Sequence, residues 1–216
     1  RIKRGRLFAF DQDSEAINYS KNKLSSIGNN YEIIKSNFCN LKEELKKRNV
    51  TKVDGILFDL GVSSPQLDEK ERGFSYHLDA RLDMRMNTEQ ELSAYEVVNS
   101  YDEAKLAKIF FEYGEEKYSK SIARAIVKAR AEKKIETTLE LVEIIKSAMP
   151  EKAKRDKHPA RKVFQAIRIE VNNELEVLKQ ALNQALDIVD VGGRVVVITF
   201  HSLEDRIVKK IFNGYS

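Results

Sequence analysis

Residues 53–66 read VDGILFDLGVSSPQ, and this stretch decides the fold class. Val53–Leu60 is apolar enough for a strand that is buried on both faces, as inner strands of parallel sheets are. A polar, turn-prone loop, residues 61–66, follows directly. Loops of this composition behind a buried strand hold ligands through backbone and side-chain polar groups.

Strand and helix patterns alternate on both sides of this stretch. Leu7–Phe10 and Tyr31–Ile34 are predicted strands; a helix capped by Asp13 or Ser14 separates them, and a short helix, Leu41–Lys47, follows the second. This βαβαβ order predicts a parallel sheet with helices on both sides. Toward the C-terminus we expect a helix over Val163–Val189 interrupted near Asn172 and Asn173, a turn at Gly192-Gly193, a buried strand over Arg194–Phe200 and a helix over Leu203–Phe212.

The region between these halves shows no strand pattern. Its apolar spacing predicts helices near Leu92–Val98, Glu103–Tyr113, Lys117–Lys134 and Leu139–Ala148. The predicted fold is therefore α/β, a parallel sheet with an inserted all-helical domain. The division is 1–74 and 162–216 for the α/β domain and 75–161 for the insertion.

Composition excludes several classes of protein. The 216 residues are 42% hydrophobic, enough for a core, yet no run approaches a membrane span and no signal segment is visible, so we expect a cytoplasmic protein without membrane contact. One cysteine, Cys39, and three scattered histidines favour no metal. No two of the nine glycines are spaced G-x-G, which excludes an intact glycine-rich nucleotide loop and a P-loop.

Charge is unevenly distributed although the net charge is only +4. His77–Glu116 holds four basic and ten acidic residues, net −6, whereas Lys117–Lys162 holds fourteen basic and six acidic, net +8. One predicted helix carries a basic stripe, and a second basic cluster follows. Such a surface binds phosphates or is simply a solvated face. The stripe is Lys117, Lys120, Arg124 and Lys128; the cluster includes Lys152, Lys154, Arg155 and Lys157.

Residues directly after each predicted strand are the candidates for ligand contact, since ligands bind beyond the carboxyl ends of such strands. Asp11 is placed to accept hydrogen bonds from ribose hydroxyls, or else to cap a helix. Phe38 is placed to lie against an adenine ring or to belong to the core. His201 is placed to contact a base or phosphate or to be structural, and Ser202 to cap the next helix. A Ser/His/Asp hydrolase is disfavoured because there is no G-x-S-x-G elbow.

Several ordered motifs together resemble one family, the bacterial 16S ribosomal RNA cytosine-N4 methyltransferases of the MraW type. The resemblance implies a Rossmann-like fold that binds S-adenosylmethionine and a helical insertion that recognises RNA of the small ribosomal subunit. It places cofactor contacts on Asp11, Phe38, Asp59 and Gln66. The motifs are AFDQD (9–13), DLGVSSPQ (59–66), RGFS (72–75), LDMRM (82–86), HPARKVFQAIRI (158–169) and FHSLEDR (200–206).

The implied reaction is methylation of a cytidine N4 amine, in which the protein's work is chiefly alignment. We expect Asp59 and the Leu60-Gly61 backbone to accept the amine hydrogens, with Ser63 and Ser64 as weaker candidates and His201 close to the base. No metal is required for this chemistry. The target base must be unstacked, and the basic stripe and cluster would hold flanking phosphates.

The sequence also departs from the family. The first glycine-rich cofactor motif and the segment after the last helix are absent, so we expect a fragment impaired in cofactor binding. A non-catalytic RNA-binding or ribosome-assembly module therefore stays open, and the residues encoded upstream of Arg1 discriminate between them. A nicotinamide dehydrogenase is a third reading, but it needs G-x-G-x-x-G before the first acid.

Overall fold

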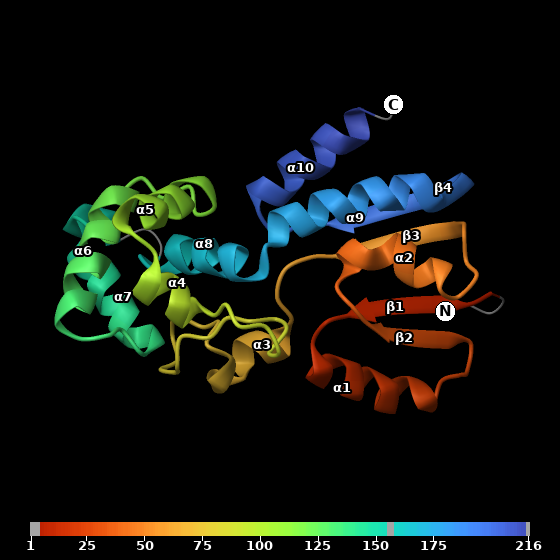
Figure 1. Ribbon diagram of the computed structural model, residues 1–216, viewed down its shortest axis with the longest axis horizontal. Helices are drawn as coiled ribbons and strands as arrows, with labels where there is room; N and C mark the ends of the chain where they lie inside the picture. The colour runs from red at the N-terminus through yellow and green to blue at the C-terminus, as the bar shows by residue number, and fades with distance from the viewer. Residues whose placement is uncertain (1–4, 155–157, 215–216) are drawn as a thin grey trace. The chain divides into compact units, whose positions relative to one another are not determined.

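The computed structural model describes residues 5–154 and 158–214. Contacts divide the chain into two compact units (Figure 1). Unit 1 comprises Arg1–Gly61, Met86–Thr88 and Glu174–Ser216, and unit 2 comprises Val62–Arg85 and Glu89–Asn173. Each unit is described by itself. None of the described helices is both long and apolar enough to cross a membrane.

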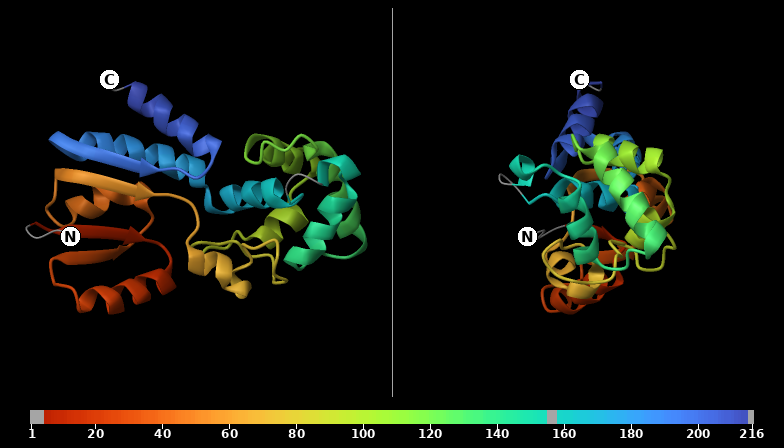
Figure 2. Two further views of the ribbon diagram at one scale, coloured as in Figure 1. Left: turned by 180° about the vertical axis from the view of Figure 1, so that it is seen from behind. Right: turned by 90° about the vertical axis from the view of Figure 1, so that its left-hand side faces the viewer.

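Unit 1 contains two separate two-stranded parallel sheets. β1 (Leu7–Asp11) pairs with β2 (Tyr31–Lys35), and β3 (Val53–Asp59) pairs with β4 (Val189–Ile198). β3 and β4 lie side by side, as the left view of Figure 2 shows. The strand positions and the parallel direction are confirmed, but the described strands do not form the single sheet that the alternation predicts. Alternating strands and helices predict parallel strands, because each helical crossover returns the chain to the same end of the sheet. They do not predict which strands become neighbours.

The helices of unit 1 follow the predicted order. Asp13 caps α1, whose first-turn amide at Glu15 donates to the Asp13 carboxylate over 3.0 Å. The elements are α1 (Ser14–Ser25), η1 (Phe38–Asn40), α2 (Leu41–Lys46), α9 (Glu174–Ile188) and α10 (Ser202–Asn213).

The core of unit 1 lies between the helices and one face of β3 and β4. Leu178 and Leu182 of α9 are fully buried against Phe58, and each such side chain contributes about 1.5–3 kcal/mol. The opposite face is open in the described residues: Leu57 is 65% exposed and Val196 51%. The prediction that both strands are buried on both faces is therefore wrong. α2, α9 and α10 pack against one face only, and a continuous apolar run cannot show which face is covered.

The expected turn at Gly192-Gly193 is a bulge inside β4. Val53 pairs with Val189, whereas Gly55 pairs with Arg194, so the four residues 190–193 lie opposite Asp54 alone and β4 has three residues in excess. β4 therefore begins five residues earlier than the apolar run that predicts it.

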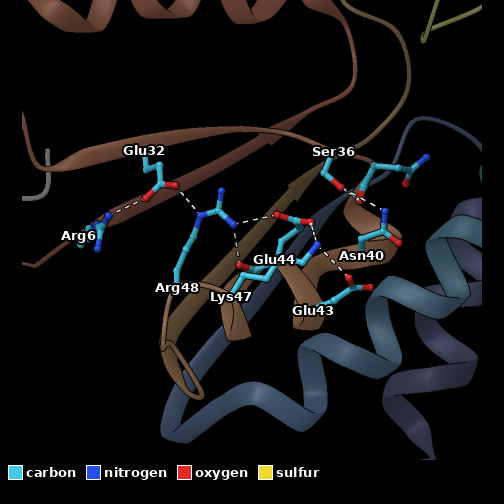
Figure 3. Close-up of polar contacts among 9 residues, drawn as sticks. Arg6, Glu32, Ser36, Asn40, Glu43, Glu44, Lys47 and Arg48 are labelled. Atoms are coloured by element: carbon cyan, nitrogen blue, oxygen red, sulfur yellow. Dashed lines mark hydrogen bonds and ion pairs between the residues drawn. The ribbon is translucent and has the colours of Figure 1, made fainter. Parts of the chain in front are cut away.

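A network of ion pairs joins β2 to the end of α2 (Figure 3). The Glu32 carboxylate accepts from Arg6 Nη2 at 2.6 Å and from Arg48 Nε at 2.5 Å. Arg48 Nη1 also donates to the Glu44 carboxylate at 2.8 Å. Hydrogen bonds from Lys47 and Arg48 lower the pKa of Glu44 and so favour its ionised form.

The described part of unit 2 contains helices, turns and one isolated antiparallel bridge, between Arg81 and Thr137. Its core includes Leu106, Phe110, Ile122 and Ile126, all fully buried. The sequence predicts every long helix but not the short α3, where Pro65 occupies the first turn. The elements are α3 (Ser64–Asp68), η2 (Lys70–Arg72), α4 (Ala94–Ser100), α5 (Glu103–Glu112), α6 (Ser119–Glu132), α7 (Thr138–Ser147), η3 (Glu151–Lys154) and α8 (Arg161–Asn172).

The predicted helix break near Asn172 is confirmed. Asn173 ends α8 in the left-handed conformation, with φ 49°, which asparagine tolerates better than most residues. The side chain of Asn172 is buried and its amide donates to the Met84 carbonyl at 2.8 Å. The break therefore also anchors the LDMRM segment to α8.

Gly73 closes a tight contact within unit 2. Its φ is +68°, and a Cβ added there would lie 2.4 Å from the Arg81 carbonyl oxygen and 2.9 Å from the Asp83 nitrogen. The neighbouring Met84 amide donates to the Arg72 carbonyl at 3.0 Å. Only glycine fits this site without strain, which explains its place in the RGFS motif.

Candidate functional site at the carboxyl ends of the strands

Asp11 ends β1 with its carboxylate exposed. Its Oδ1 accepts from the Asp13 amide at 2.8 Å, which orients the carboxylate at the end of the strand. Because Asp13 caps α1, capping does not account for Asp11. The geometry therefore suits Asp11 for accepting hydrogen bonds from ligand hydroxyls.

Asn37 links the turns after β1 and β2, and the sequence analysis did not single it out. Its Nδ2 donates to Gln12 Oε1 at 3.1 Å, while its Oδ1 accepts from the Cys39 amide at 3.0 Å. Gln12 in turn contacts Met86 Sδ at 3.8 Å. Asn37 thus fixes the turn that presents Phe38, and its place directly before Phe38 is the only sequence signal for it.

Phe38 is half-buried at the start of η1. Its ring meets Phe58 of β3 edge to face, with centroids 5.7 Å apart and planes at 70°. It also packs against the core of unit 1. Part of the Phe38 ring therefore packs in the core, and the rest of the ring surface is accessible to a ligand.

Asp59 ends β3 beside the last residue of β4. It pairs with Ile198, and the Leu60 amide donates to the Ile198 carbonyl at 3.2 Å. The Asp59 side chain is exposed. Gly61 follows with φ +84°, and a Cβ there would lie 3.4 Å from the Phe200 ring, which is itself 68% exposed.

His201 and Glu204 form a buried pair where β4 meets α10. The Glu204 carboxylate accepts from the Phe200 amide at 2.8 Å and the His201 amide at 3.3 Å, while its other oxygen lies 3.2 Å from His201 Nε2. Burial acts to raise the pKa of Glu204, but hydrogen bonding by His201 and the Phe200 amide prevails and lowers it. Sequence reasoning missed Glu204; its signal was an acid three residues after a helix N-cap.

Ser63 and Gln66 belong to unit 2 and hydrogen-bond each other. The Gln66 amide donates to Ser63 Oγ at 3.3 Å, and the Ser63 amide donates to Gln66 Oε1 at 3.1 Å. This capping box starts α3 and gives both predicted site residues a structural role. Ser63 is exposed, whereas Gln66 is buried.

The predicted basic stripe lies on and just before α6. Lys117, Lys120, Arg124 and Lys128 are exposed, while Ile122 and Ile126 are buried, as the spacing predicts. Arg124 approaches Glu103 Oε1 at 3.5 Å but its side chain is 77% exposed. Of the second cluster, Lys152 is exposed and Lys154 lies in η3; Arg155 and Lys157 lie outside the described residues.

Aromatic side chains of unit 2 gather around Tyr76. Its ring stacks on His158 with centroids 4.5 Å apart and lies equally close to His77. Phe74, by contrast, is 6% exposed and belongs to the core. Tyr76 and His77 are therefore better placed than Phe74 to touch a nucleic acid.

Parallel strands with exposed carboxylates at their carboxyl ends, such as Asp11 and Asp59, are typical of α/β proteins that bind a ligand beyond those ends. Residues 1–216 match the MraW methylase family, and the chain belongs to that family, which makes it a methyltransferase. It is 60% identical over 213 residues to "Ribosomal RNA small subunit methyltransferase H" of Exiguobacterium sibiricum, covering 98% of this chain and 68% of the relative.

Proposed function

We propose that this methyltransferase uses S-adenosylmethionine to methylate the N4 amine of a cytidine in 16S ribosomal RNA, within the cytoplasm. The observation that carries the proposal is Asp59, an exposed carboxylate at the carboxyl end of β3 in a chain of the MraW methylase family. The relative's name supports RNA of the small subunit as the substrate. A non-catalytic RNA-binding module on the same fold is less favoured, because the relative is named as an enzyme.

The residues at the strand ends fit the proposed cofactor. Asp11 offers an exposed, oriented carboxylate for ribose hydroxyls, and Phe38 offers the accessible part of its ring for adenine. Asp59 offers a second carboxylate. The contact of Gln66 with the cofactor stays a prediction from the family resemblance, because Gln66 belongs to unit 2, where its side chain caps α3. S-adenosylmethionine, when bound, supplies a methyl group that its sulfonium has already activated.

Asp59 and the adjoining backbone would hold the acceptor amine. The N4 lone pair of cytosine is delocalised into the ring, so a carboxylate and carbonyls that accept the amine hydrogens would favour a pyramidal amine, whose lone pair is no longer delocalised and can face the methyl group. Gly61, with a left-handed φ of +84°, forms the turn that follows Asp59 at the end of β3. The proton leaves once the nitrogen is cationic, so the residues position the amine without a strong base.

Unit 2 would recognise the RNA. In this proposal it is an all-helical domain inserted into a Rossmann-like methyltransferase domain. The exposed Lys120 and Lys128 on α6 and the exposed Lys152 in η3 would contact phosphates next to the target, and Tyr76 would touch an unpaired base. We assign residues 75–161, the greater part of unit 2, to this role, and residues 1–74 and 162–216 to the methyltransferase domain, although α3 and α8 of these ranges pack in unit 2.

The test is transfer of tritiated methyl to small ribosomal subunits by the chain together with any residues its gene encodes upstream of Arg1. Asp59→Asn keeps the shape of the side chain and removes its charge, and transfer should fall by about 100-fold or more. Asp54→Asn changes an exposed aspartate on the same strand and serves as the matched control, with transfer unchanged.

Cofactor binding is measured separately by calorimetry. Loss of transfer with binding retained supports the alignment role of Asp59, whereas equal turnover by the Asp59 and Asp54 variants would reject it. Absence of transfer by the unaltered protein, with cofactor demonstrably bound and assembled subunits supplied, would favour the RNA-binding module instead.

A further inference from the structure

Three aromatic rings of unit 2 contact one another and reach solvent. Tyr76 stacks on His158 with centroids 4.5 Å apart and planes at 24°. The ring of His77 lies 4.5 Å from that of Tyr76 and 5.1 Å from that of His158. Phe164 of α8 supports Tyr76 from the core, edge to face at 5.7 Å. His77 is exposed, and the other two rings of the cluster are half-buried.

Hydrogen bonds on both sides of His77 fix the segment that carries it. Thr138, buried in the first turn of α7, donates its hydroxyl to the Leu78 carbonyl at 2.6 Å and accepts from the Ala80 amide at 3.0 Å. The His77 amide donates to Ser75 Oγ at 3.1 Å. Because the segment is already ordered, a ligand that stacks on its rings costs little further conformational entropy.

The polar edges of these rings are available to a ligand. Among the described residues, no hydrogen bond involves the Tyr76 hydroxyl or either ring nitrogen of His77. His158 Nδ1 accepts from the Ala160 amide at 3.3 Å, so the neutral imidazole carries its proton on Nε2. Burial, together with the proximity of His77 and Lys146, lowers the pKa of His158 and so favours that neutral ring. The cluster therefore suits a ligand that has both a flat face and polar edges.

Positive charge lies on both sides of His158 along the chain. Arg161 begins α8 just after it, and Lys152 of η3 precedes it. Both cations are exposed, and neither makes an ion pair within the part of the chain that the structure describes. The segment 117–162, which holds all three residues, has a net charge of +8. Phosphates that flank a base stacked on the cluster would be attracted to these cations.

We propose that His77 and Tyr76 form a stacking platform for one unpaired RNA base other than the cytidine that is methylated. The base would lie against the exposed ring of His77 and the accessible part of Tyr76, while His158 holds Tyr76 in place. Every base has a face that can stack, so the platform contributes affinity for single-stranded RNA rather than choice of sequence. This inference rests on the proposed recognition of RNA by unit 2 and assigns the residues that bind a base.

The experiment measures, by fluorescence anisotropy, how the whole protein binds a labelled oligouridylate and the same ribose-phosphate backbone without bases. His77→Ala should weaken binding of oligouridylate by about 5- to 150-fold, the effect of losing one stack between a base and an aromatic ring. It should leave binding of the abasic probe unchanged. His77→Phe keeps a ring and should bind both probes as the unaltered protein does. Tyr19→Ala removes a tyrosine of unit 1 that is 65% exposed, and this matched control should change neither affinity.

Equal affinity of the His77→Ala and Tyr19→Ala variants for oligouridylate would overturn the proposal. An equal loss on both probes would overturn it as well, because the ring would then act on phosphates or on the fold. Loss of affinity in His77→Phe would exclude stacking, and circular dichroism of each variant checks that the fold is kept. Neither S-adenosylmethionine nor the target site is present, so a failure of methyl transfer leaves this result standing, and the reverse also holds.

Discussion

Replacing Gly73 by alanine should destabilise unit 2 by about 2–5 kcal/mol. The φ of +68° costs a residue with a Cβ about 1–2 kcal/mol. The new Cβ would also meet the Arg81 carbonyl oxygen at 2.4 Å and the Asp83 nitrogen at 2.9 Å. Both are backbone atoms, which cannot rotate away, so overpacking adds about 1–3 kcal/mol.

Gly73→Asn separates these two contributions. Asparagine tolerates the left-handed conformation but carries the same Cβ, so it should be less destabilising than alanine by about 1 kcal/mol and still clearly worse than glycine. Gly28→Ala is the control, since Gly28 is exposed and its new Cβ would meet only the Asn30 side chain at 3.3 Å. Its effect should stay within about 0.5 kcal/mol.

The assay is urea unfolding followed by tyrosine fluorescence, which reports mainly on unit 2 because five of the eight tyrosines lie there. The free energy of unfolding comes from the midpoint and slope of each transition. If Gly73→Ala proved no more destabilising than Gly28→Ala, the close contact between residues 73 and 81–83 would not exist in solution. If Gly73→Asn were as stable as the unaltered protein, the cost would be conformational alone.

Two further predictions concern charge. An ion pair with Lys133, together with two backbone amides, lowers the pKa of Glu140 from 4.5 to about 2; its stabilisation is therefore complete above pH 4.5 and lost as pH falls toward 2. Because the Glu140 side chain is 36% exposed, this loss of unfolding free energy is about 1 kcal/mol. Urea unfolding measured between pH 5 and pH 2 should show the loss in the unaltered protein and not in Glu140→Gln. Replacing Lys120 and Lys128 by alanine should reduce the salt slope of RNA binding by about 1.4, at about 0.7 per phosphate contact. Lys46→Ala, an exposed lysine of unit 1, should leave the slope unchanged, and an unaltered slope in the double variant would identify the stripe as a solvated face.

Local patterns predicted the elements well because local forces form them. The apolar runs at Leu7, Tyr31 and Val53 begin strands at those residues, and the spacing of Ile122 and Ile126 places the buried face of α6. Asp13 caps α1 as its position before the helix indicates.

Tertiary features were less accessible from the sequence. The exposed faces of Leu57 and Val196 could not be predicted, since an apolar run does not show which side lacks a covering layer. The pairing of His201 with Glu204 depends on how α10 begins at the end of β4. The capping box of Ser63 and Gln66, in contrast, is a local feature. The resemblance assigns Gln66 to the cofactor, and the same side chain also caps α3.

The pairing of β3 with β4 has a consequence for the order of folding. Asp59 and Ile198 are neighbours in the sheet but 139 residues apart in the chain. Such non-local contacts form slowly, because the loop-closure entropy is lost before the pairing is gained. The helices of unit 2, built mainly from neighbouring segments, should fold first and shorten that loop. During synthesis β3 would thus leave the ribosome long before β4 exists. Its backbone hydrogen-bonding groups would stay unpaired, and Leu57 would stay exposed, until β4 has been made.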